Sequence, residues 1–193
     1  MNEPVAYTER DDIPARLNGG VPVSIKTYGG DTICLGDALR MFENVSRLRY
    51  ELITLGYYQN DENTKTLTNV TEFDASDSRE LLFGEVTEQE IRQLRHLIVS
   101  IPKGVAPPET KRSVTQLKNQ LNQKSGYVKF NPKIDSGSQR RLQCSIPKYS
   151  RFLSSNRERI IDYSEDGLLR EVQLTRVIVS GRRVRNSQVY ASS

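Results

Sequence analysis

The sequence predicts an α+β protein, on three observations. Apolar residues recur at helical spacing in segments whose ends carry capping residues. Runs rich in β-branched residues and bounded by glycine turns occur near the N-terminus and again towards the C-terminus. No apolar run approaches the length of a membrane-spanning helix. The expected architecture is an N-terminal β-hairpin plus two amphipathic helices, followed by a basic, mainly antiparallel β region with one short helix.

The first 35 residues predict an extended arm and then a hairpin. Residues 1–20 contain two prolines and an acidic run, close on Asn-Gly-Gly, and have little apolar surface to bury. Residues 21–28 and 32–35 are β-rich and flank Gly29, Gly30 and Asp31. Paired glycines accept the positive φ of a tight turn, so the two runs are predicted to pair with each other.

Residues 37–56 form the longest predicted helix. Asp37 is a suitable N-cap, and Gly56 is a suitable C-terminal stop. On the polar face, Glu43 with Arg47 and Arg47 with Glu51 are four residues apart, a spacing that supports a helix. The apolar face comprises Ala38, Leu39, Met41, Phe42, Val45, Leu48, Leu52, Ile53 and Leu55.

A short strand over residues 66–73 and a second amphipathic helix are predicted next. Thr87 and Glu90 have the spacing of a capping box at the start of this helix. Its apolar positions run to Ile101, and Pro102 ends it. Residues 102–108 then contain three prolines and are the predicted linker.

The second half of the chain predicts one short basic helix and several strands, with residues 148–159 left unassigned. The helix covers residues 109–124, and two strands cover residues 127–130 and 141–146. A three-stranded meander is predicted over residues 160–163, 168–179 and 182–190. The predicted organisation is an extended arm (1–20), an acidic α/β-hairpin subdomain (21–101), a linker (102–108) and a basic β-rich subdomain (109–193).

Charge is distributed very unevenly along the chain. Residues 1–100 contain 10 Lys and Arg against 17 Asp and Glu, whereas residues 101–193 contain 18 against 7. Such an asymmetry indicates either a polyanionic partner for the basic half or contact between the acidic and basic halves of different copies. A third interpretation stays open, in which the two halves neutralise each other within one molecule.

The residue inventory disfavours the common enzyme classes. The chain has one histidine, His96, and two cysteines, Cys34 and Cys144, which are too few for a conventional zinc site. It contains no P-loop, no dinucleotide-binding glycine motif and no nucleophile elbow. We therefore expect no cofactor, no small-molecule substrate and no enzymatic activity.

Basic residues interleaved with aromatic ones make nucleic acid an expected partner of the second half. Cations neutralise phosphates and release counterions, while aromatic rings stack on unpaired bases. The candidate nucleic-acid-binding residues are Lys111, Arg112, Lys129, Lys133, Arg140, Arg141, Lys148, Arg151, Arg182, Arg183 and Arg185.

An alternative hypothesis is a divalent-metal-dependent, nuclease-like enzyme. Asp162, Asp166 and Glu171 cluster around the first turn of the predicted meander, where carboxylates on adjacent strands would hold a metal ion. The lysine expected two residues after the glutamate is Gln173 here, which weakens the match.

The leading hypothesis is a non-enzymatic assembly subunit. It would self-associate through its acidic and basic halves as a homo-oligomer or multi-copy assembly, with nucleic acid as a further partner. A virion component or other particle protein would suit the extended arm and the thin core, which the mean hydropathy of −0.59 indicates. The acidic, polar N-terminus lacks the features of a secretory signal, and with so few cysteines we expect a cytoplasmic protein.

Overall fold

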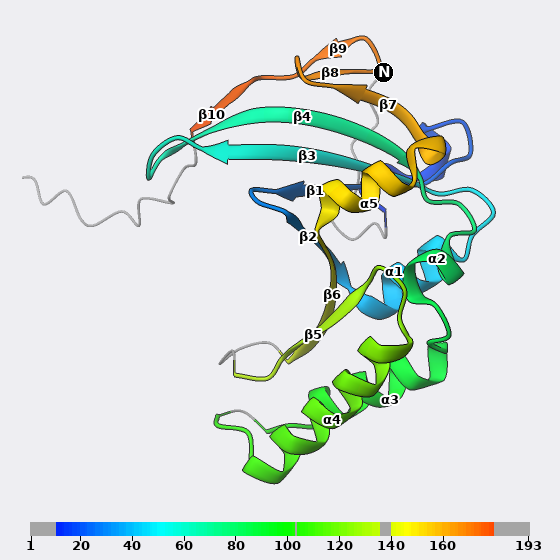
Figure 1. Ribbon diagram of the computed structural model, residues 1–193, viewed down its shortest axis with the longest axis vertical. Coiled ribbons are helices and arrows are strands. Elements are labelled where there is room, and N and C mark those ends of the chain that lie inside the picture. Colours follow the sequence, from blue (N-terminus) through cyan, green and yellow to red (C-terminus); the bar gives the residue numbers. More distant parts are fainter. Residues whose placement is uncertain (1–10, 103, 136–139, 180–193) are drawn as a thin grey trace, which may run out of the picture.

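Helices and strands are mixed along the chain, so the predicted α+β class is confirmed (Figure 1). The computed structural model describes residues 11–102, 104–135 and 140–179. Within these ranges the α-helices are α1 (Ala38–Val45), α2 (Arg79–Phe83), α3 (Glu88–Val99), α4 (Pro108–Lys124) and α5 (Tyr149–Ser155). The strands are β1 (Val23–Tyr28), β2 (Thr32–Asp37), β3 (Glu51–Gln59), β4 (Thr64–Asp74), β5 (Lys129–Lys133), β6 (Arg141–Pro147), β7 (Ile160–Ser164), β8 (Leu168–Leu169), β9 (Val172–Gln173) and β10 (Val177–Val179). Two short 3-10 helices, η1 (Ala15–Leu17) and η2 (Arg157–Arg159), complete the described structure.

The strands form two principal sheets. The large sheet has the order β1-β3-β4-β10, and β7 pairs with the remaining part of β4. Only β1 and β3 are parallel among these pairs. The small sheet is antiparallel, with the order β2-β6-β5. Figure 1 shows the large sheet above the small one, with α1 to α4 gathered beside and below the small sheet and α5 beneath the large one.

The predicted N-terminal hairpin is wrong, although both of its strands exist. β1 pairs with β3 in the large sheet, and β2 pairs with β6 in the small sheet. The Gly29-Gly30 turn therefore directs the chain from one sheet to the other. Ile33 and Leu35 on β2 are buried in the main core, and this burial favours pairing with β6 over a local hairpin.

The predicted helix over residues 37–56 is half right. Its first part is α1, with the Asp37 Oδ1 accepting a hydrogen bond from the Arg40 N–H at 2.9 Å. The helix ends at Val45, and β3 follows. Leu52 lies in the main core, while Ile53 packs in a second cluster on the other face of the large sheet. A strand buried on both faces carries a continuous apolar run, and this run mimicked helical spacing.

The predicted charge pairs along that helix are also wrong. Arg47 Nη1 pairs with Asp11 Oδ2 at 3.1 Å, and Glu43 Oε1 pairs with Arg92 of α3 at 3.3 Å. Glu51 Oε2 pairs with Arg170 Nη2 at 2.6 Å. Once the chain turns after α1, residues four apart no longer share a helix face, so each charge takes a tertiary partner instead.

The elements with clear end signals are confirmed. The capping box at Thr87 and Glu90 is formed in both directions, and α3 runs from it to Val99. The predicted basic helix is α4, with Val114 and Leu121 buried. The strand predicted over residues 66–73 is the inner part of β4, and those predicted over residues 127–130 and 141–146 correspond to β5 and β6.

The two halves of the chain share one core and both principal sheets. The predicted linker falls between α3 and α4, and strands from either side of it pair as β2 with β6 and as β4 with β7. Phe83 from the first half packs against Phe42, with ring centroids 5.1 Å apart, and against Phe130 from the second half, with centroids 6.0 Å apart. Acidic and basic segments are thus interleaved in space.

The predicted C-terminal meander is wrong in its connections. β7 and β10 both pair with β4, and the middle strand is interrupted by the small β8–β9 hairpin. Residues 182–190, its third strand, lie outside the described residues. The unassigned stretch over residues 148–159 contains α5, whose Tyr149 and Phe152 are buried.

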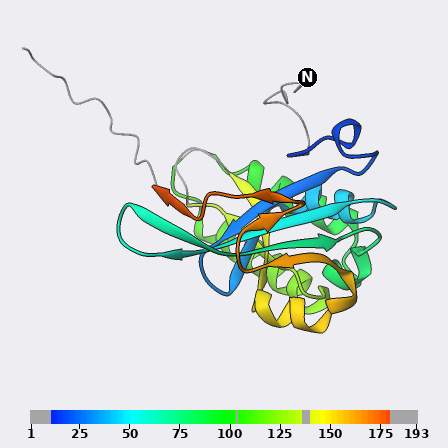
Figure 2. The same ribbon diagram turned by 90° about the horizontal axis from the view of Figure 1, so that it is seen from above.

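The β8–β9 hairpin covers part of the upper face of the large sheet (Figure 2). Leu169 and Leu174 pack on the cluster of Val23, Ile53, Leu67 and Val70. Arg170, at the hairpin turn, contacts Glu72 through both carboxylate oxygens and Glu51 at 2.6 Å. The same guanidinium donates to Asn18 Oδ1 at 2.5 Å. This Arg170 clamp fastens the hairpin to the sheet.

Of the arm predicted over residues 1–20, only the last ten residues are described. Ile13 forms an antiparallel bridge with Val23, and η1 follows it. This part of the arm therefore packs on the large sheet instead of extending away from it. Among the described residues, no helix has the length and apolar character needed to cross a membrane.

Candidate polyanion-binding surface

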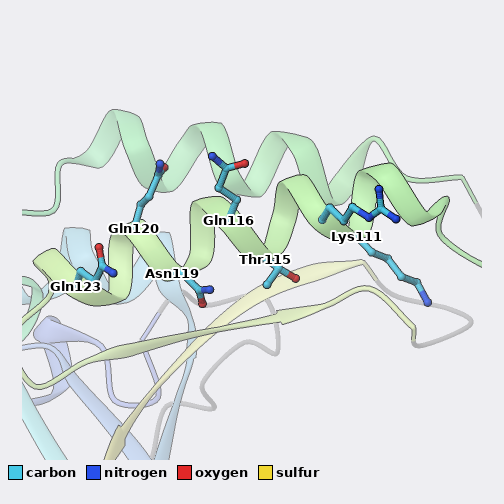
Figure 3. A pocket seen from close by; sticks show the side chains of 7 residues that line it. Lys111, Thr115, Gln116, Asn119, Gln120 and Gln123 are labelled. Atoms are coloured by element: carbon cyan, nitrogen blue, oxygen red, sulfur yellow. The ribbon is translucent and has the colours of Figure 1, made fainter.

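The outward face of α4 carries a polar strip that runs the length of the helix (Figure 3). Val114 and Leu121 turn the other face inward against the core. A helix with one narrow apolar stripe leaves most of its circumference to water. The strip lines a shallow groove of about 540 Å³ and comprises Lys111, Arg112, Thr115, Gln116, Asn119, Gln120 and Gln123. We call this set the α4 surface.

Every side chain of the α4 surface can donate a hydrogen bond, and none is a carboxylate. In Figure 3, Thr115 and Asn119 lie on the side of the β5–β6 strands, whereas Gln116 and Gln120 lie on the side of α3. Cations with amide and hydroxyl donors are the groups that contact phosphate and sugar oxygens in protein–nucleic-acid complexes. The arrangement therefore suits an anionic, oxygen-rich chain.

The end of the β5–β6 hairpin adds further positive charge beside this helix. Lys133 and Arg141 face each other in the antiparallel register and are both exposed. Lys111 Nζ pairs with Asp135 Oδ1 at 3.0 Å, which ties the start of α4 to the segment after β5. Both partners of this pair are substantially exposed, so the pair is weak and exchangeable.

Two of the predicted binding residues have structural roles instead. Lys129 Nζ donates to the carbonyl oxygen of Asn122 at 2.9 Å and to Ser125 Oγ at 3.1 Å, at the C-terminal end of α4. Lysine in this position satisfies carbonyls that lack helical partners. Arg140 Nη2 donates to the carbonyl oxygens of Pro102 at 2.9 Å and Gly104 at 2.5 Å. Because these two cations bind main-chain carbonyl oxygens, their side chains are less available to contact a ligand.

Of the remaining candidates, Lys148 and Arg151 do not line the α4 surface. Lys148 stands at the N-cap of α5 with φ 53°, and Arg151 is exposed on the same helix. Arg182, Arg183 and Arg185 lie outside the described residues. Sequence reasoning also missed the Gln, Asn and Thr members of the α4 surface. Their recurrence at three- and four-residue steps was the available signal.

Part of the charge asymmetry is neutralised within the molecule. Lys124 Nζ pairs with Glu90 Oε1 at 2.6 Å, and this contact lowers the pKa of the Glu90 carboxyl. Arg170 pairs with Glu72 and Glu51 across the same division of the chain. Among the described residues, the Lys111 ion pair is with Asp135, which itself belongs to the basic half, and Arg112 forms no ion pair.

The carboxylates of the nuclease hypothesis are exposed and lie on one strand and in two turns. Asp162 lies on β7, Asp166 in the turn after it, and Glu171 at the β8–β9 turn. Throughout residues 11–102, 104–135 and 140–179, no three Asp, Glu, His or Cys side chains gather closely enough to hold a metal ion. Gln173 Nε2 instead donates to the Asp166 carbonyl oxygen at 2.8 Å, so it closes a turn.

The two cysteines lie on the paired strands β2 and β6 but differ in burial. Cys34 is exposed on β2, whereas Cys144 is buried on β6. Burial is the main cause that raises the pKa of the Cys144 thiol. His96 is exposed on α3.

Comparison with known proteins gave no matching family model, curated protein or solved structure.

Proposed function

We propose that the protein is a non-enzymatic subunit that binds a nucleic-acid backbone through the α4 surface. The observation that carries this proposal is the composition of that surface, which pairs Lys111 and Arg112 with five neutral hydrogen-bonding side chains and contains no acid. Lys133 and Arg141 extend the positive charge onto the adjoining hairpin end. Together these groups match the phosphates and sugar hydroxyls of one strand.

Recognition of this kind is expected to be insensitive to base sequence. Contacts to phosphate and sugar fix the position of a protein on a nucleic acid but carry no sequence information directly. Each phosphate neutralised by Lys or Arg releases condensed counterions, so the affinity falls as salt increases. Four cations engaging a single strand predict a slope of log K against log salt of about −3.

The double variant Lys111→Gln/Arg112→Gln tests this proposal. Each lost phosphate contact on a single strand is expected to make the salt slope shallower by about 0.7, so the double variant should shift it by about 1.4. Fluorescence anisotropy of a labelled single-stranded RNA, measured between about 50 and 200 mM salt, reports the slope. Lys65→Gln/Arg79→Gln makes the same change of charge at exposed positions outside the α4 surface and serves as the control.

An equal loss in both double variants would mean that net charge alone governs binding. That result, or salt-independent binding by the unchanged protein, would refute a role for the α4 surface. A preserved slope in the control with a shallower slope in the α4 variant supports it.

We further propose that copies associate through surfaces of opposite charge. The unequal charge of the two halves, with the α4 cations not engaged by the acidic half within the described ranges, supports this proposal. Sedimentation velocity at low salt is expected to show a concentration-dependent increase in sedimentation coefficient that high salt reverses, because charge contacts are screened within about 10 Å at 0.1 M. A monomer at every concentration and salt would contradict the proposal.

A further inference from the structure

A second cleft, of about 800 Å³, lies beneath the large sheet on the side covered by α5. It is bounded by the β1–β2 turn, by α5 and by strands β4 and β7. The lining includes both aromatic and charged groups, which no sequence pattern had indicated as a site. The lining residues on which the following argument depends are Tyr28, Asn69, Leu153, Arg157, Ile160 and Tyr163.

The helical wall of this cleft is held firmly in place. Tyr149 is fully buried, and its hydroxyl lies 3.1 Å from Thr54 Oγ1 on β3. The start of α5 is fixed by Asp31, whose Oδ1 accepts hydrogen bonds from the Ser150 N–H at 2.9 Å and the Ser150 hydroxyl at 2.7 Å. Phe152 packs on Phe73 with ring centroids 5.2 Å apart. The cleft is therefore formed before any ligand arrives.

Tyr28 and Asn69 form the inner end of the cleft. The Tyr28 hydroxyl donates to Asn69 Oδ1 at 2.7 Å, and its ring packs edge-on against Tyr149. Gly56 lies opposite Asn69 in the ladder, and a Cβ there would stand 2.7 Å from Asn69 Nδ2. Because Gly56 has no side chain, the Asn69 amide can lie across β3. Asn69 keeps one N–H and one oxygen lone pair beyond its contacts with Tyr28 and Thr68.

The outer end of the cleft offers an aromatic face and a cation. Tyr163 on β7 is 50% exposed, and its hydroxyl donates to Glu165 at 3.2 Å, which leaves the ring faces open. Arg157 is exposed and has no ion-pair or hydrogen-bond partner for its guanidinium in the part of the chain that the structure describes. Leu153 and Ile160 supply the apolar floor between these groups.

We propose that this cleft binds one unpaired nucleotide, with the base between the tyrosine rings and the phosphate on Arg157. Aromatic rings stack on any base, and stacking contributes about 1–3 kcal/mol per base. The guanidinium presents a planar set of donors that matches phosphate oxygens. Asn69 has the donor and acceptor needed to contact a base edge. The inference rests on the proposed function in one respect, because it treats the nucleotide as part of a bound strand.

Isothermal titration calorimetry with the full chain and each of the four ribonucleoside 5′-monophosphates tests the cleft by itself. At least one monophosphate is expected to bind, and the corresponding nucleoside, which lacks the phosphate, should bind about tenfold more weakly. Arg157→Gln should weaken the monophosphate about tenfold and leave the nucleoside unchanged. Tyr163→Ala should weaken both, because it removes the stacking face. Arg151→Gln, on α5 but outside the cleft lining, is the matched control and should change neither.

The outcomes separate this inference from the proposed function. Lys111→Gln/Arg112→Gln should leave the monophosphate affinity unchanged, while Tyr163→Ala should leave the salt slope of RNA binding unchanged. Competition between a monophosphate and a single-stranded oligonucleotide identifies the bound strand as the source of the nucleotide, whereas its absence identifies a free nucleotide. If no monophosphate binds at millimolar concentration, or if Arg157→Gln and Tyr163→Ala have no effect, the inference is overturned even where the α4 surface binds RNA.

Discussion

Arg170→Ala is expected to lower the free energy of unfolding by about 3 kcal/mol. Glu72 is 3% exposed, and Arg170 contacts both of its carboxylate oxygens. Truncating the arginine leaves a buried carboxylate without its counter-charge, a change that typically costs 3–5 kcal/mol. We take the lower end because the Arg170 side chain is itself 39% exposed, so water reaches part of the space that it vacates.

The backbone conformation at this turn also depends on the contacts of Arg170. Arg170 and Glu171 have φ values of 47° and 68°, in the left-handed region that disfavours residues with a side chain. Such a conformation persists where the surrounding contacts determine it. The five hydrogen bonds of Arg170 with Glu72, Glu51 and Asn18 offset that cost. Alanine at the same position keeps the strain and loses the contacts.

Urea denaturation followed by circular dichroism measures the effect. Arg176→Ala is the matched control, because Arg176 pairs with Asp166 at 3.9 Å and the two side chains are 53% and 91% exposed. An exposed pair of that kind contributes less than about 1 kcal/mol. If Arg170→Ala and Arg176→Ala shift the midpoint equally, the clamp does not hold the β8–β9 hairpin.

The helices with explicit end signals could be predicted from the sequence. The prediction was wrong where a strand is buried on both faces of a sheet. Asp37, Thr87 and the prolines of residues 102–108 mark local hydrogen-bonding needs that any fold must satisfy, so α1, α3 and α4 start as expected. β3 was not predicted, because its consecutive residues Leu52 and Ile53 are buried in clusters on opposite faces of the sheet. No local signal distinguishes such a run from a helix.

Of the two candidate sites, one could be predicted in part from local sequence and the other could not. The cations of the α4 surface follow from charge and helical spacing, which are local properties of the sequence. The cleft beneath the large sheet joins Tyr28, Asn69, Arg157 and Tyr163, which lie on a strand, another strand, a 3-10 helix and a third strand. Their proximity depends on β7 pairing with β4. Only the tertiary structure brings them together.

Gly84→Ala is expected to destabilise the protein by about 4 kcal/mol. Gly84 follows α2 with φ 58° and ψ −128°, a region that essentially only glycine occupies. A Cβ there would stand 2.4 Å from the carbonyl oxygen of Lys124 and 3.0 Å from the amide nitrogen of Gly126. Both neighbours are backbone atoms, so a side-chain rotation cannot relieve the overlap. Backbone strain and overpacking each contribute about 1–3 kcal/mol.

Thermal unfolding with circular dichroism compares this variant with Gly30→Ala, where an added Cβ meets no atom within 4 Å. Gly84 belongs to the acidic half, whereas Lys124 and Gly126 belong to the basic half. The overlap is therefore between a Cβ of one half and backbone atoms of the other. Gly84→Ala should lower the midpoint of one cooperative transition that includes both halves. Two separate transitions, with only the first displaced, would show instead that residues 109–193 fold as an independent unit and that the shared core does not couple the halves.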